Sequence, residues 1–164
     1  MDMVAGTSAG RSAETSKFGT LDFSLRFSGE RRYQPGARIS GQVMIQAREP
    51  WQVVFAEAIL FFRTEGMGTR DEGRAATVSL APPGRDIMRT LDAPFEFTAP
   101  PLPSTYYGTH IKIHWLVGIY VQGKGGKVHG LIEIPVIIHP EPESVQMPEV
   151  IPGNAGKPVT VATL

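Results

Sequence analysis

The sequence predicts an all-β domain: a two-sheet antiparallel β-sandwich of immunoglobulin-like architecture with about seven or eight strands. Two observations lead to this prediction. Several short runs alternate apolar and polar residues with a period of two, most clearly at 21–28 and 111–122. The 18 glycines and 14 prolines are scattered between such runs, where they mark turns. No segment predicts a helix longer than a turn or two, and no internal repeat is present.

The length of 164 residues is enough for one domain with short appendages. Residues 1–18 are small, polar and aperiodic, which is typical of a disordered tail. The sandwich is expected over 19–140. Residues 141–164 form a proline-rich C-terminal tail, in which Val159 to Ala162 offer one added strand.

The first half of the sandwich begins with a half-buried strand from Leu21, followed by a turn containing Pro35 and Gly36. A second alternating strand covers 39–47. Gly41 takes an inward position there, which indicates a bulge or the close approach of a neighbouring strand. The segment Val53 to Glu65 is apolar on both faces and rich in β-branched and aromatic residues, so it is expected to be a central strand.

A polar, glycine-rich loop is expected over 64–74. Weak strand patterns follow at 77–80 and 87–91, and a short strand at 95–98 leads into a proline corner at 100–103. This rigid corner is expected to set the entry angle of the strand that follows it.

That strand, 111–121, places Ile111, Ile113, Trp115 and every second residue after them on the core side. Trp115 and Phe97 are expected to anchor the core. A hairpin turn returns the chain as an antiparallel partner over 131–138. Pro135 lies inside this return strand, so part of it is expected at a sheet edge.

Three segments resemble the N-terminal domain of the arrestin family. They are YQPGARISGQVMI (33–45), WQVVFAEAILFFRTEG (51–66) and FEFTAPPLPSTYYGTHIKIHWLVGIYV (95–121), and the resemblance extends over about 20–139. It implies an arrestin-like sandwich and a role as an adaptor or scaffold. Arrestins and the related retromer subunit carry two such sandwiches, whereas this chain has room for one, so the resemblance does not imply phosphate sensing through a charged cluster between domains.

Composition excludes several classes of function. The 16 basic and 16 acidic residues balance, so no overall field favours nucleic acid or an anionic membrane. The absence of cysteine excludes disulfides and thiolate metal sites. No secretory h-region begins the sequence and no run is long and apolar enough for a membrane helix, so we expect a soluble, cytoplasmic protein without membrane insertion.

Neither catalysis nor a cofactor is indicated. The sequence lacks a nucleophile elbow and a phosphate-binding glycine loop. His110 and His114 share a strand face but lie roughly 13 Å apart at about 3.3 Å per residue, too far for one metal ion. Glu57, inside the most apolar strand, is most simply a solvent-facing or hydrogen-bonded sheet residue. We therefore expect no enzyme activity, no cofactor and no metal.

Two sets of residues are candidates for binding a protein partner. One is the outward face of the long strand: His114, Leu116 and Tyr120. The other is the charged loop: Arg70, Asp71, Glu72 and Arg74. The alternatives are that the second sheet or the tail covers the strand face, and that the loop charges are merely solvated.

The sequence thus favours a non-enzymatic adaptor that binds other proteins through its edge strands and loops. A structural subunit of a larger assembly is the alternative, and a homodimer through an edge strand or the C-terminal tail is compatible with both. A lipid or small-molecule carrier is a third interpretation, which the many inward Phe, Ile and Val residues disfavour.

Overall fold

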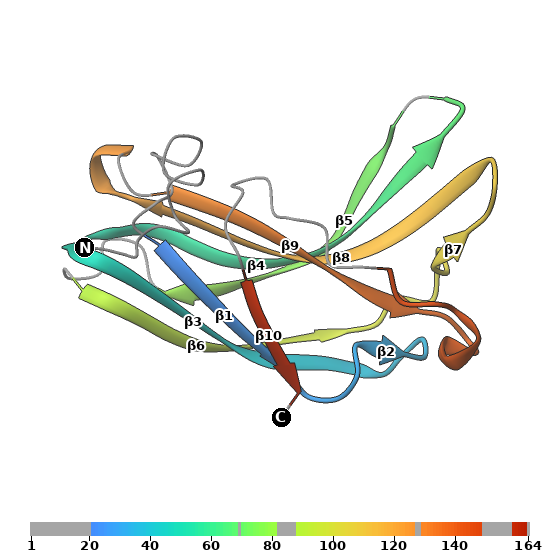
Figure 1. Ribbon diagram of the computed structural model, residues 1–164, viewed down its shortest axis with the longest axis horizontal. Helices are drawn as coiled ribbons and strands as arrows, with labels where there is room; N and C mark the ends of the chain where they lie inside the picture. Colours follow the sequence, from blue (N-terminus) through green and yellow to red (C-terminus); the bar gives the residue numbers. More distant parts are fainter. Residues whose placement is uncertain (1–20, 69, 82–87, 127–128, 149–158, 164) are drawn as a thin grey trace, which may run out of the picture.

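The computed structural model describes residues 21–68, 70–81, 88–126, 129–148 and 159–163 as two packed β-sheets (Figure 1). The predicted all-β sandwich is confirmed. The strands and the two short 3-10 turns are β1 (Leu21–Phe27), β2 (Arg32–Tyr33), β3 (Arg38–Trp51), β4 (Val53–Gly66), β5 (Glu72–Ala81), β6 (Met88–Thr98), β7 (Tyr106–Tyr107), β8 (Ile111–Gly123), η1 (Lys124–Gly126), β9 (His129–Ile138), η2 (Pro142–Ser144) and β10 (Val159–Thr163).

One sheet has four strands in the order β10-β1-β3-β6. In β1 the apolar residues are buried and the polar residues between them reach solvent, as its period-two pattern predicted. The β1–β3 ladder runs antiparallel from Leu21 opposite Ala47 to Phe27 opposite Gly41. β10 pairs with β1 in parallel, so this sheet is not antiparallel throughout.

The other sheet has six strands, in the order β2-β9-β8-β4-β5 with β7 on the early part of β8. β4 lies between β8 and β5, which confirms the prediction of a central strand. β8 is also central and pairs with both β4 and β9. β2 pairs with β9 only at Ile137 and Ile138, so most of β9 forms a sheet edge among the described residues, as Pro135 indicated.

The core lies between the inner faces of the two sheets. Trp115 and Phe97 are buried, so both predicted anchors are confirmed. The Phe62 ring meets Trp115 edge-on, with centroids 5.3 Å apart. Phe27 and Phe95 make a similar contact at 5.5 Å across the four-stranded sheet. Such edge-to-face pairs add about 0.5–1.5 kcal/mol beyond the area that they bury.

Gly41 is the site of a close approach, as its inward position predicted. A Cβ atom there would lie 2.2 Å from the carbonyl oxygen of Arg26 and 2.8 Å from the ring of Phe95. The ring of Phe95 therefore occupies the space that a larger residue would need.

The proline corner is fixed to the strands on either side of it. The indole Nε1 of Trp115 donates a hydrogen bond to the carbonyl oxygen of Pro103 at 2.7 Å. The Thr105 N–H donates to the carbonyl of Ile138 at 2.8 Å, and the Ile138 N–H donates to Thr105 Oγ1 at 2.9 Å. Thr105 is buried. The pairing of β8 with β9 ends at Val136, and Thr105 hydrogen-bonds to β9 beyond that point, at Ile138.

Several boundaries differ from the prediction. β4 continues to Gly66 and β5 already begins at Glu72, so the expected loop over 64–74 is a tight hairpin turn. The strand patterns at 87–91 and 95–98 belong to one strand, β6. The tail expected over 1–18 lies outside the described residues. Beyond 140 the chain forms η2 and, after the undescribed residues 149–158, the strand β10. The described part of the chain contains no helix with the length and apolar character of a membrane span.

Candidate functional site

Large apolar side chains are exposed at one end of the sandwich. Within the described residues seven such side chains are exposed, and four of them belong to segments that meet there: Met67, Leu102, Tyr106 and Ile111. Strand pairing brings the segments of Met67, Tyr106 and Ile111 together, since Gly66 lies opposite Ile111 and Tyr107 lies opposite Lys112. The segment of Leu102 is held to β8 by the hydrogen bond from Trp115 to the carbonyl of Pro103. Figure 1 shows the β4–β5 hairpin and the β7–β8 turn at this end, extending past the four-stranded sheet. We call these four residues the apolar end.

This end corrects one expectation about β8. Ile111 was expected in the core, but 47% of its side chain is exposed. Ile111 lies on the core side of β8, as the alternation predicted. At this end, however, the six-stranded sheet extends past the four-stranded sheet, which therefore does not cover Ile111 (Figure 1). Met67, at the hairpin tip, is 89% exposed. Apolar groups exposed to this extent in neighbouring loops are a feature of interaction surfaces.

Charged residues of the predicted partner loop border the apolar end. The Thr64 N–H donates to the carbonyl of Asp71 at 2.8 Å, and the Asp71 N–H donates to Thr64 Oγ1 at 3.1 Å, which closes the hairpin. Arg70 lies 3.7 Å from the carboxylate of Glu65; the Arg70 side chain is largely exposed and that of Glu65 is half-buried. The other two residues of the predicted loop, Glu72 and Arg74, lie in strand β5.

A cluster of charges covers the outer face of the six-stranded sheet. Arg63 on β4 donates to both carboxylate oxygens of Glu133 on β9, at 3.1 and 2.8 Å. Its Nε donates to Glu72 on β5 at 2.5 Å. The side chains of Arg63 and Glu133 are only 15% and 12% exposed. The hydrogen bonds to Glu133 raise the pKa of Arg63 further above its usual value, more than the burial of the guanidinium lowers it.

This cluster explains the position of Leu116, which is a second correction. Leu116 was expected on an outward surface, but its side chain is 3% exposed. It faces outward between Phe61 on β4 and Pro135 on β9. The Arg63–Glu133 pair spans β8, to which Leu116 belongs, and so helps to cover it. Leu116 is therefore not accessible to a partner.

Beside the cluster is an open hollow of about 320 Å³. It is lined by Ile59, Phe61, Glu72, Arg74, Tyr120, Leu131 and Glu133. On β8, Tyr120 lies opposite Glu57, and Gly118, two residues earlier on the same face, lies opposite Ile59. Gly118 has no side chain, and the ring of Phe61 lies 3.1 Å from where its Cβ would be. The hollow thus brings together three of the residues predicted to bind a partner: Glu72, Arg74 and Tyr120.

His114 lies apart from the hollow, near the apolar end. Its buried Nε2 lies 3.3 Å from the carboxylate of Glu65 but makes no hydrogen bond with it. The ring of Tyr107 packs beside it, with centroids 5.3 Å apart. Burial lowers the pKa of His114; the charge of Glu65 raises it, while Lys112, Arg63 and Arg70 lower it further. His114 is thus a half-buried packing residue that resists protonation.

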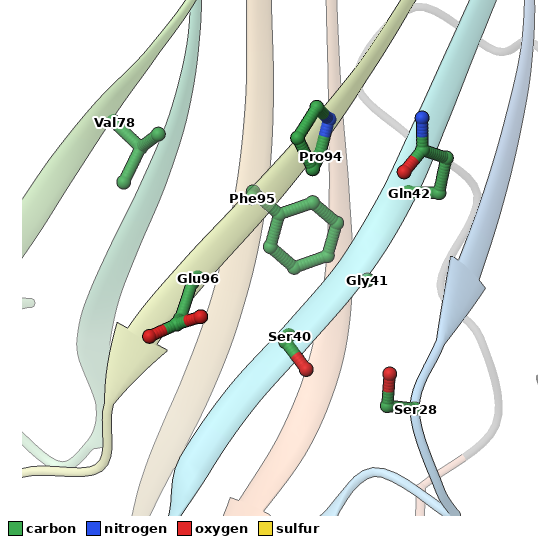
Figure 2. Close-up of a pocket in the computed structure, with 8 residues that line it drawn as sticks. All are labelled: Ser28, Ser40, Gly41, Gln42, Val78, Pro94, Phe95 and Glu96. Carbon is green, nitrogen blue, oxygen red and sulfur yellow. The ribbon is translucent and has the colours of Figure 1, made fainter.

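A second hollow, of about 480 Å³, lies on the four-stranded sheet (Figure 2). Ser28, Ser40, Gly41, Gln42, Val78, Pro94, Phe95 and Glu96 line it. Figure 2 shows the Phe95 ring beside the chain at Gly41, with Gln42 and Pro94 next to each other on neighbouring strands. Its lining combines short polar side chains with a single aromatic ring, that of Phe95, and one carboxylate, that of Glu96.

Within the described residues, no group of three or more potential ligands is placed to hold a metal ion. Sequence reasoning missed Arg63, Glu133, Ile59 and Phe61. A signal for the first two was present, because Glu133 lies between two isoleucines of β9 and Arg63 directly follows the apolar run of β4. Such residues are seldom buried unless they are paired.

Comparison with known proteins supports the fold. The chain matches no protein-family description and no curated protein. Among solved structures it is similar to the crystal structure of Spo0M, a sporulation control protein from Bacillus subtilis, with a TM-score of 0.60 and 16% sequence identity. The match covers 77% of this chain and 53% of the Spo0M chain, so this chain corresponds to about half of that protein. At this identity the likeness shows a common sandwich fold.

Proposed function

We propose that this chain is a non-enzymatic adaptor domain of arrestin-like type that binds a cytoplasmic protein partner at its apolar end. The observation that carries the proposal is the gathering of Met67, Leu102, Tyr106 and Ile111 on segments that meet at one end of the sandwich. A large apolar residue in water gains roughly 1.5–3 kcal/mol when it is fully buried. Several such residues together form the centre of an interface.

The surroundings of the apolar end suit protein recognition. Arg70, Glu65 and Lys112 give it a rim of both charge signs, which favours orientation and specificity over raw attraction. The segments that carry the apolar residues are held by the Thr64–Asp71 hydrogen bonds and by the Trp115–Pro103 bond. A preorganised surface of this kind loses little entropy when it binds. The similarity to Spo0M, a sporulation control protein, supports a regulatory role of this kind but names no partner.

The test is site-specific photocrosslinking in the source cells. A photoreactive phenylalanine analogue is placed at Met67, at Ile111 or, as a control, at Met44. Met44 is an exposed methionine on β3, in the other sheet. We expect Met67 and Ile111 to yield the same crosslinked protein, and Met44 to yield none of it.

The charge variants Met67→Glu and Ile111→Glu should abolish that crosslink from the other position. Equal crosslinking from Met44 would refute the proposal. Crosslinks only between copies of this chain would favour the structural-subunit alternative instead. Recovery of lipid rather than protein at Met67 would favour a membrane surface as the partner.

A further inference from the structure

The edge formed by β9 has an open half. β9 runs from His129 to Ile138, but β2 pairs with it only at Ile137 and Ile138. Among the described residues no other strand pairs with this side of β9. This open half lies at the far end of β9 from the apolar end, because β9 begins opposite Gln122 and finishes near Trp115 (Figure 1).

The direction of the backbone groups follows from two contacts. The Ile137 N–H donates to the carbonyl of Arg31 at 2.9 Å, on the side away from β8. The carbonyl of Pro135 accepts a hydrogen bond from Arg31 Nη1 at 3.1 Å on that same side. Because successive residues of a strand direct their N–H and C=O to alternate sides, Glu133 and Leu131 also direct theirs outward.

Pro135 therefore sits where its missing N–H does no harm. Its nitrogen faces the edge, so the ladder to β8 is not interrupted. The β8–β9 ladder pairs eight successive residues of each strand without a register shift. Up to Glu133, β9 thus presents a regular edge whose outward donors and acceptors have no backbone partner within the part of the chain that the structure describes.

Two other described edges, β5 and β6, are less suited to pairing. β5 has two register shifts against β4, and such bulges twist an edge away from a new strand. β6 carries Pro94 and a register shift against β3. The half of β9 before Pro135 has neither feature.

We propose that the open half of β9 accepts an extended segment of a partner protein as an added strand, bound through the backbone of Leu131 and Glu133. The N–H and C=O groups of these two residues offer four main-chain hydrogen bonds. The hollow lined by Leu131, Tyr120 and Glu133 lies beside them on the outer face. Around the hollow Arg63 and Arg74 balance the charges of Glu133 and Glu72. The segment that fits is therefore extended and uncharged, with an apolar side chain next to Leu131 and no proline opposite either residue.

The first test uses short unstructured peptides, selected from a phage-displayed library on the whole protein, and amide hydrogen exchange. We expect the selected peptides to slow exchange at Leu131 and Glu133, whose amides are open in the free protein. The amides of Ile132 and Ile134 face β8 and should exchange slowly with or without peptide. A library that yields no peptide, or only peptides that leave Leu131 and Glu133 unprotected, overturns the proposal. Protection of these amides already in the free protein would also overturn it, since the chain itself would then occupy the edge.

A matched pair of variants tests the backbone directly. Leu131→Pro removes one outward N–H, and the native Pro135 shows that the strand accepts proline at a position facing this way. Leu131→Lys keeps the N–H and changes only the side chain. We expect Leu131→Pro to keep the wild-type urea midpoint and to weaken peptide binding about tenfold or more, while Leu131→Lys weakens it less.

Equal binding by wild type and Leu131→Pro would overturn the proposal. If Leu131→Pro fails to fold, the exchange measurement on wild type decides alone. The apolar end is untouched by these variants, so a failure here leaves the proposed docking of a partner at Met67 and Ile111 standing.

Discussion

Removing Arg63 should destabilise the fold, because its partner Glu133 is largely buried. Arg63→Met keeps the aliphatic stem but deletes the guanidinium that donates to Glu133 at 3.1 and 2.8 Å. The Glu133 side chain, which is only 12% exposed in the intact pair, is then left without its counter-charge. Loss of one partner of a buried ion pair costs about 3–5 kcal/mol. Because some solvent still reaches this pair, we expect about 3 kcal/mol.

The companion variants separate pairing from packing. Glu72 is half-exposed, so Glu72→Gln should cost less than about 1 kcal/mol. The double variant Arg63→Met, Glu133→Leu removes both charges and leaves apolar side chains over Leu116. Replacement of a buried pair by apolar residues is often neutral or stabilising, so the double variant should lie within about 1 kcal/mol of wild type.

Urea unfolding followed by tryptophan fluorescence measures these free energies, because both Trp51 and Trp115 are buried. The reasoning is refuted if Arg63→Met loses less than about 1 kcal/mol, which is the value for an exposed pair. It is refuted equally if the double variant is no more stable than Arg63→Met.

Three further predictions use the same unfolding assay. Thr105→Val leaves the buried Ile138 N–H unpaired and should cost about 1–3 kcal/mol, whereas Thr105→Ser keeps the acceptor and most of the stability; equal losses would contradict the hydrogen bond. Gly41→Ala should cost about 1–3 kcal/mol or more through overpacking, whereas Gly68→Ala, with open space around it, should not destabilise the fold; a tolerated Gly41→Ala would show that no close approach exists. Because the pKa of His114 is lowered in the folded state, protonation favours unfolding, so its contribution is fully present above about pH 6.5 and declines as the pH falls below that value. His114→Gln should flatten this decline, and an unchanged pH profile would exclude His114 as its source.

The fold was predictable where the residue pattern of a single strand indicates which of its faces is buried. Leu21 to Phe27 alternate because one face of β1 meets the core and the other meets water. The proline corner and the central position of β4 were predicted equally well, because clustered prolines indicate a rigid turn and a continuous apolar run indicates a strand buried on both faces. β5 was partly missed because Glu72, Gly73 and Arg74 resemble a loop; they form a strand because β4 supplies their hydrogen bonds.

The candidate site was less predictable because it depends on distant residues. The alternation of β8 predicts that Leu116 is exposed. It is buried because Arg63 and Glu133, which are 70 positions apart in the sequence, pair across β8 and help to cover it. Ile111 resembles a core residue until the lengths of the two sheets are compared. Glu72 and Arg74 were predicted as loop residues and Tyr120 as part of a strand face. Only the register of β5, β4 and β8 shows that the three border one hollow.

The proposed docking of a partner at the apolar end is tested by amide hydrogen exchange of the whole protein, with and without the partner protein that is crosslinked at Met67. We expect slowed exchange at 64–71 and 106–113, and no change along the outer face of β3 around Met44. Slowed exchange at β3 with none at 64–71 or 106–113 would contradict it.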